Sequence, residues 1–223
     1  MPKGPDSVRK AKDEPNRSLS DLAYDEIKWR IISDEIKSGV LLTENDLCDI
    51  TGYGKAPIRS ALLELKHDKL VDVVRRKGFF VRPWSADEAG HLLFMRRLIE
   101  PALAAEAARQ AGREDIARLG KIVSDARKNV AKANRRALIQ GDNDFHIAIA
   151  RASGNPIAAE VVERLKLRSH YLWHVSISNQ SQLEAVQTQH EAIFAAIEAH
   201  DPEAAEATFK KHLNLLDANR SSV

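Results

Sequence analysis

The apolar residues of this chain follow the period of an α-helix along most of its length, and change to the pattern of short β-strands in residues 70–81. Leu70–Val74 is rich in β-branched residues, and Phe79–Val81 is a second short extended run. Between them lies Arg75–Gly78, a turn in which glycine can adopt a positive φ. Three helical segments precede this hairpin, so the order of elements predicts a winged helix-turn-helix.

The three helical segments are marked by their apolar spacing and their end residues. The first starts near Asp21 and is predicted to run to Gly39, and the second follows Thr43. The third starts near Lys55, with Pro57 in its first turn, where a missing N–H costs least. Its apolar residues recur at i, i+3, i+4 and i+7, which indicates one buried face: Ile58, Ala61, Leu62 and Leu65.

From residue 85 onward the pattern is wholly helical, and Ser85 and Glu88 resemble a capping box. Helices are predicted near residues 86–111, 114–131, 134–153, 156–177, 181–200 and 202–217. Their connections are short, which favours antiparallel neighbours in a bundle.

The expected fold is therefore mainly α, with three parts along the chain. A disordered basic arm at residues 1–17 holds three prolines and almost no large apolar residues. The winged helix-turn-helix, with three helices and a small β-hairpin, covers residues 18–84. An all-α antiparallel bundle covers residues 85–223.

The composition narrows the class of protein. Hydrophobic residues make up 43% and charged residues 30%, which is ordinary for a chain that buries a core. No apolar run approaches the ~18 residues of a membrane span, and the single cysteine, Cys48, cannot form an internal disulfide. We expect a soluble, cytoplasmic protein with no membrane partner.

The formal net charge is only +2, but the basic residues are unevenly spread. Residues 53–82 hold eight basic and three acidic side chains, which indicates a contact surface for an anion such as a phosphate backbone. A chance fluctuation of charge over thirty residues is the alternative.

Lys55 and Arg59 lie one turn apart on the face of the third helix opposite its apolar residues. An arginine there can enter the major groove and grip guanine O6 and N7. Arg75, Arg76 and Lys77, at the hairpin tip, could contact phosphates or an adjacent groove. The alternative is that these charges merely solvate a helix and a loop.

Residues 20–83 resemble the DNA-binding domain of GntR-family transcription regulators. The motifs are Leu47-x(9)-Pro57-Ile58-Arg59-x-Ala61-Leu62-x-x-Leu65, then Leu70-Val71 and Arg76-Lys77-Gly78-Phe79-Phe80-Val81. The resemblance implies that the third helix is the recognition helix and that Arg59 contacts operator bases. Lys55 falls where the family usually has an arginine, and Asn45 where another DNA-contacting arginine is usual.

The second half carries a possible metal constellation. Asp142 and His146 have the i, i+4 spacing that puts two side chains on one face of a helix. His190 and His212 lie in the last two predicted helices, which a bundle could bring inward. Three imidazoles and one carboxylate suit Zn²⁺, Ni²⁺ or Mn²⁺. Such residues are also common on solvated helices, and the pair His170 and His174 has the same spacing.

A second resemblance bears on this choice. The run Asp142-x-x-Phe145-His146-x-x-Ile149-x-x-Ala152-Ser153-Gly154-Asn155, with Gln189-His190-Glu191 and Lys211-His212-Leu213, resembles the FCD effector domain of the FadR subfamily. In metal-containing members these positions bind the ion, here Asp142, His146, His190 and His212, with zinc expected first and nickel or manganese as alternatives.

Small carboxylates often bind at that metal and at a cavity arginine in FCD domains. The matching element here is Arg96-x-x-Ile99-Glu100. Arg96 is thus a candidate for effector binding, although an ion pair with Glu100 at i+4 is an equal alternative. His170 and His174 have no family role to transfer.

The combined resemblances imply a homodimeric transcription regulator, expected to be a repressor, that reads two-fold operator DNA and responds to a small carboxylate effector. It would not be an enzyme. One alternative is a metal-dependent enzyme that uses the three histidines and Asp142. Another is a regulator whose metal ion is purely structural.

Overall fold

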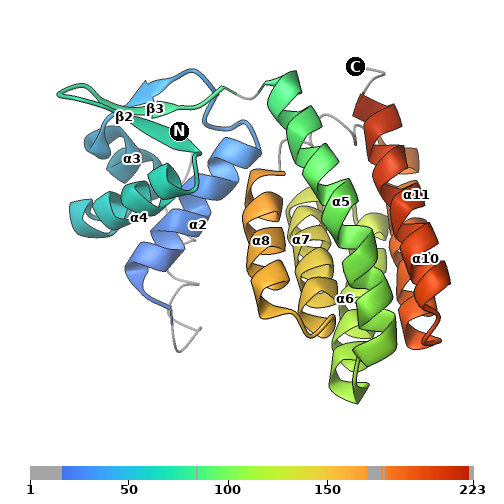
Figure 1. Ribbon diagram of the computed structural model, residues 1–223. Helices are drawn as coiled ribbons and strands as arrows, with labels where there is room; N and C mark the ends of the chain where they lie inside the picture. Colours follow the sequence, from blue (N-terminus) through green and yellow to red (C-terminus); the bar gives the residue numbers. More distant parts are fainter. Residues whose placement is uncertain (1–16, 84, 170–176, 178, 221–223) are drawn as a thin grey trace. The chain divides into compact units, whose positions relative to one another are not determined.

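The computed structural model describes residues 17–83, 85–169, 177 and 179–220. The chain divides into two compact units between residues 84 and 85. In Figure 1 the first unit is a group of helices with a small sheet, and the second is a bundle of helices. The expected mainly α fold is confirmed. The arm predicted at residues 1–17 lies outside the described residues, apart from Arg17.

The first unit has the elements of a winged helix-turn-helix, with strand order β1-β3-β2 and both pairs antiparallel. Its elements are α2 (Leu19–Ile32), β1 (Leu41–Leu42), α3 (Glu44–Thr51), α4 (Lys55–His67), β2 (Val71–Val74) and β3 (Gly78–Val81). The predicted hairpin is β2–β3. Strand β1 was not predicted, because two residues are too few to show an alternating pattern.

One apolar core holds the helices of this unit against the sheet. The face of α4 that was expected to be buried is at most 1% exposed: Ile58, Ala61, Leu62 and Leu65. It packs with Ile27 and Ile31 of α2 and with Val71 and Val81 of the sheet. Because that face turns inward, the opposite face of α4 lies at the surface.

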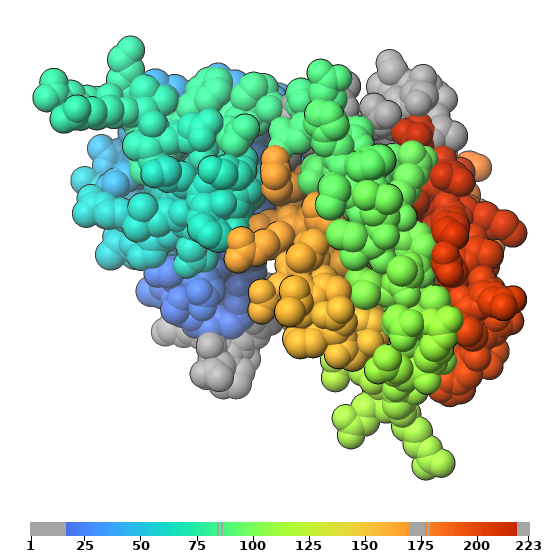
Figure 2. Space-filling model, viewed as in Figure 1, coloured from blue at the N-terminus to red at the C-terminus, as the bar shows by residue number. Residues whose placement is uncertain are grey.

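The turn between β2 and β3 depends on a glycine. The N–H of Lys77 donates to the carbonyl of Val74 at 2.9 Å. Gly78 has φ +132°, and a Cβ at this position would lie 2.3 Å from the carbonyl oxygen of Leu42. A side chain would therefore clash with β1. Figure 2 shows the β2–β3 turn projecting from the surface of its unit.

The first helix is shorter than predicted, since α2 ends at Ile32 rather than at Gly39. Asp34 adopts φ 60°, and the N–H of Ile36 donates back to the carbonyl of Arg30 at 2.9 Å. This turn returns Ile36 to the core, where it is 6% exposed. The apolar spacing predicts a continuing helix because Ile36 falls in register with the buried residues of α2. In the structure a turn, and not a helix, buries Ile36.

The second unit consists of packed helices. They are α5 (Ala86–Gln110), α6 (Arg113–Ala131), α7 (Arg135–Ala152), α8 (Pro156–Arg168), α10 (Gln180–Glu198) and α11 (Pro202–Arg220). Helix α5 packs against α7, α8, α10 and α11, and α6 packs against α7 and α10. None of the helices in the described ranges is both long and apolar enough to cross a membrane.

The boundaries of α8 show one prediction that holds and one that was wrong. The side chain of Asn155 accepts a hydrogen bond from the N–H of Ala158 at 3.0 Å, and Pro156 fills the first helical position as expected. The helix predicted over residues 156–177 ends at Arg168, with Ser169 as its C-cap. His170 and His174 lie outside the described residues.

Candidate metal centre and nucleic-acid interface

The structure brings the four predicted ligand residues together inside the second unit. Asp142 and His146 come from α7, His190 from α10 and His212 from α11. One ligand atom from each lies within 4.8 Å of the others. All four are buried, with exposures from 0% for His212 to 9% for Asp142.

Two of the imidazoles have unsatisfied nitrogens. Among the described residues, the buried Nε2 atoms of His190 and His212 have no hydrogen-bond partner. The Oδ1 atom of Asp142 lies 3.6 Å from Nε2 of His146 and 3.5 Å from Nε2 of His190. Because unpaired buried nitrogens are costly, their grouping around one carboxylate oxygen fits a metal ion.

Hydrogen bonds on the outer ring nitrogens favour the tautomer that a metal needs. Nδ1 of His146 contacts a carboxylate oxygen of Glu100. Nδ1 of His212 lies 3.2 Å from Oε1 of Gln189. A proton on Nδ1 of His212 would leave its Nε2 lone pair free for an ion. Nε2 of His146 also lies 3.4 Å from Nη2 of Arg96, so an ion would replace this contact.

Burial sets the protonation of the cluster. Loss of solvation lowers the pKa of His190 to about 3 and that of His212 well below its usual value, so both rings are neutral. Burial opposes ionisation of Asp142, but Lys166 and His146 outweigh it and hold the pKa of that carboxyl well below its usual value. The cluster therefore presents the neutral imidazoles of His190 and His212 beside the ionised carboxylate of Asp142.

Arg96 on α5 is paired inside the unit. Its Nε lies 2.5 Å from Glu100 Oε1, and its Nη2 lies 3.3 Å from Nδ1 of His146. The Arg96–Glu100 ion pair that the i, i+4 spacing offered as an alternative is thus present. Both of its residues contact His146, a candidate metal ligand. Arg96 itself is 1% exposed.

Lys166 on α8 is a cluster residue that sequence reasoning missed. Its Nζ lies 2.5 Å from Asp142 Oδ2, and the residue is 2% exposed. Burial lowers the pKa of Lys166, against the carboxylates of Asp142 and Glu100, which raise it. Ala159, Val162 and Lys166 share the buried face of α8, so a lysine in an apolar spacing was the available signal.

Two carboxylates that are close in sequence to the candidate ligands, Asp144 and Glu191, are not part of the cluster. Asp144 is exposed. Glu191 accepts two hydrogen bonds from Arg127 on α6, at 2.7 and 2.6 Å. Neither is placed as a general base beside the cluster.

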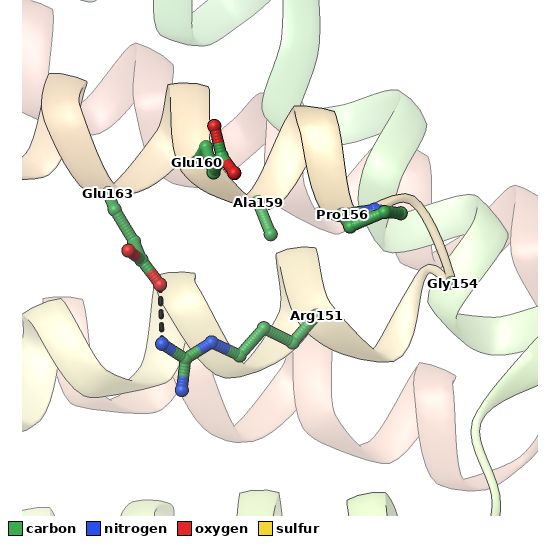
Figure 3. A pocket seen from close by; sticks show the side chains of 6 residues that line it. All are labelled: Arg151, Gly154, Pro156, Ala159, Glu160 and Glu163. Atoms are coloured by element: carbon green, nitrogen blue, oxygen red, sulfur yellow. Dashed lines mark hydrogen bonds and ion pairs between the residues drawn. The ribbon is translucent and has the colours of Figure 1, made fainter.

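A surface hollow at the α7–α8 turn is a different feature. It is lined by Arg151, Gly154, Pro156, Ala159, Glu160 and Glu163 (Figure 3). Arg151 and Glu163 form an ion pair across it, with 57% and 39% of their side chains exposed. Its charged groups are solvated, in contrast to those of the histidine cluster.

The predicted DNA-reading residues all lie at the surface of the first unit. Lys55 and Arg59 are exposed on α4, and Arg75, Arg76 and Lys77 are exposed in the β2–β3 turn. Arg59 is also oriented, because its Nε and Nη2 donate to the carboxylate of Glu44 at 3.0 and 2.9 Å. Two of its five N–H groups are used, which leaves others for a base edge.

Two family models match this chain, one in each of its two compact units. The model of the FCD domain matches residues 91–215, and that of the bacterial regulatory proteins, gntR family, matches residues 19–81. The HTH-type transcriptional repressor RspR of Escherichia coli strain K12 is 23% identical over 199 residues, covering 89% of this chain and 87% of RspR.

Two solved structures share the fold. E. coli McbR/YncC aligns with a TM-score of 0.77 and 22% identity over 93% of this chain and 99% of that chain. The metal-free FCD domain of TM0439 aligns with a TM-score of 0.52 and 20% identity, covering 62% of this chain and 96% of that chain.

Proposed function

Because the chain belongs to the GntR family of bacterial regulatory proteins and carries an FCD domain, it is a transcription regulator and not an enzyme. We propose that it is a cytoplasmic repressor whose operator affinity is controlled by a small carboxylate effector at a divalent metal ion. The observation that carries this proposal is the buried cluster of three histidines and Asp142, in which two imidazole nitrogens have no hydrogen-bond partner among the described residues.

The donor set favours zinc. Three imidazole nitrogens and a carboxylate oxygen are typical zinc ligands, and nickel and manganese accept a similar set. Asp142, His146, His190 and His212 would hold the ion, which when bound would supply a Lewis-acidic centre for a carboxylate oxygen. Arg96 would add positive charge beside His146 while it remains paired with Glu100.

The first unit would read the operator with α4 and its wing. Arg59, oriented by Glu44, and Lys55 would enter the major groove and contact base edges. Arg75, Arg76 and Lys77 would contact phosphates, which position the unit without specifying sequence. The similarity to RspR, which is a repressor, favours repression over activation.

A homodimer would present two such units to a two-fold operator. Large apolar side chains are exposed on α5 and α8, which pack against each other: Phe94 and Leu98 at 59% each, and Ile157 at 75%. Exposed apolar residues gathered on neighbouring helices favour contact with a second copy.

Helix α5 offers a route from the effector to the DNA-binding unit. It begins at its N-cap Ser85, where the second unit starts, and it carries Arg96 and Glu100 beside the cluster. An effector that favours one position of α5 would favour one placement of the winged units. Without such a differential effect it could not change DNA affinity.

The test measures operator affinity at fixed salt concentration. A selection from random duplexes with full-length protein supplies the operator, and anisotropy titrations then compare zinc-loaded and chelator-treated protein with and without small carboxylates. We expect a carboxylate to weaken binding roughly 5- to 150-fold, and only in the zinc-loaded protein. If operator affinity stays constant when the effector site is saturated, the effector does not control DNA binding. If the selection enriches no duplex, the protein does not read a DNA sequence.

The alternative of a purely structural ion has its own readout. The variant His190→Ala removes one proposed ligand. Lost thermal stability with effector binding retained would favour a structural ion, whereas loss of both supports the proposed effector site.

A further inference from the structure

The buried charges of the second unit are balanced in pairs. Among the described residues, four with formal charges are buried, and all four lie at the histidine cluster: Arg96, Glu100, Asp142 and Lys166, at 1%, 2%, 9% and 2% exposure. Arg96 pairs with Glu100, and Lys166 pairs with Asp142. Imidazoles bind a metal ion in their neutral form, so the three histidines would add no charge to a metal-bound cluster.

The two oxygens of Asp142 face different partners. Oδ1 lies 3.5–3.6 Å from the Nε2 atoms of His190 and His146, on the side of the proposed ion. Oδ2 is held by the ammonium of Lys166. A divalent ion on the Oδ1 side would therefore bind the same carboxylate that neutralises the charge of Lys166.

An ion bound here would leave the buried cluster with two uncompensated positive charges. Uncompensated charge away from water is costly, and a bound anion can remove that cost. An anion with one negative charge would neutralise one of these two positive charges, and an anion with two negative charges would neutralise both. Lys166 also has three N–H donors, of which its pairing with Asp142 needs one.

We propose that Lys166 is an effector-binding residue and that the effector is a small dicarboxylate, one of whose carboxylates is bound by the Lys166 ammonium. This inference rests on the proposed function, since it assumes the ion and a carboxylate effector. It goes beyond the family resemblance, which points to the ion and to Arg96 and not to a lysine on α8.

Calorimetric titration of full-length, zinc-loaded protein tests the proposal directly. The probes are malonate and succinate against acetate and propionate, at constant ionic strength and with zinc content measured before each titration. We expect at least one dicarboxylate to bind about tenfold or more tightly than either monocarboxylate, because a hydrogen bond between charged groups has that effect.

The variant Lys166→Met should remove this preference while zinc content and monocarboxylate affinity change little. Lys166→Arg, which keeps the charge, should retain it at least in part. Lys121→Met is the matched control, because Lys121 is 77% exposed on α6 and should behave as wild type. If the Lys166→Met variant does not bind zinc, the Lys166→Gln variant is used in its place. The comparison of mono- and dicarboxylate affinities in the wild-type protein tests the proposal without any variant.

The outcomes separate the two proposals. Equal affinity for mono- and dicarboxylates, or a preference that survives in Lys166→Met, would overturn the role of Lys166 and leave the proposed function standing. No binding by any of the four carboxylates would overturn the carboxylate effector itself, and this inference with it.

Discussion

The imidazole of His146 on α7 is hydrogen-bonded through Nδ1 to the carboxylate of Glu100 on α5. The two residues are 46 positions apart in the chain. Glu100 is also paired with Arg96, so it links a candidate metal ligand to the helix that begins the second unit. A partner of this kind orients the ring and raises its basicity as a ligand.

Glu100→Gln should weaken metal binding by about 10- to 100-fold, because the amide cannot replace the charged partner of His146. Competition with a chromogenic chelator measures the affinity. Glu106→Gln is the matched control, since Glu106 lies on the same helix with 45% of its side chain exposed. Equal metal affinities for the two variants would show that Glu100 does not support the ligand.

The metal-free protein should lose stability as the pH falls. Burial lowers the pKa of His190 to about 3, whereas the unfolded chain takes up a proton near pH ~6.5. Between these values the unfolded state binds more protons, so the free energy of unfolding decreases by up to about 1.4 kcal/mol per pH unit for each such histidine.

Urea unfolding of chelator-treated protein at several pH values in that window measures this slope. His190→Gln should give a shallower slope, because one of the titrating groups is gone. The control His67→Gln alters a side chain that is 72% exposed and should keep the wild-type slope. A His190→Gln slope as steep as the wild-type slope would contradict the assignment.

Arg59→Ala should cost about 1–3 kcal/mol of operator binding and relax the sequence preference. The guanidinium is exposed on α4 and held by Glu44, so its loss leaves the fold of the unit intact. Competition between the selected operator and single-base variants measures both effects. An unchanged base preference would remove Arg59 from the reading role.

Arg76→Ala should weaken binding to all duplexes alike. Arg76 lies in the projecting β2–β3 turn and would contact phosphate, so the salt dependence of log K should lose about one unit of slope. A salt series with operator and scrambled duplex measures this slope. A loss confined to the operator would instead indicate a base contact.

Sequence patterns predicted most of the first unit because its constraints are local. The i, i+3, i+4, i+7 spacing in α4 identified the buried face, and Gly78 marked the turn where only glycine fits. The end of α2 was wrong because a residue can return to a core through a turn, as Ile36 does. Spacing alone does not distinguish the two cases.

The histidine cluster was only partly predictable. Spacing placed Asp142 and His146 on one face, while the convergence of His190 and His212 was expected from family resemblance and depends on how α7, α10 and α11 pack. Lys166 was missed because a buried lysine needs a carboxylate that lies 24 residues away in the chain. Such pairings are set by tertiary contacts, which one sequence does not display.

The bidentate hold of Glu44 on Arg59 has a thermodynamic consequence for binding to DNA. A free arginine loses roughly 2 kcal/mol of rotamer entropy when it is fixed. Arg59 is already ordered in the free protein, so part of this loss precedes the encounter. The wing arginines project into solvent and would lose their entropy only on contact. If α4 and the β2–β3 turn contact DNA as proposed, Arg59 would therefore lose less rotamer entropy on binding than Arg75 and Arg76.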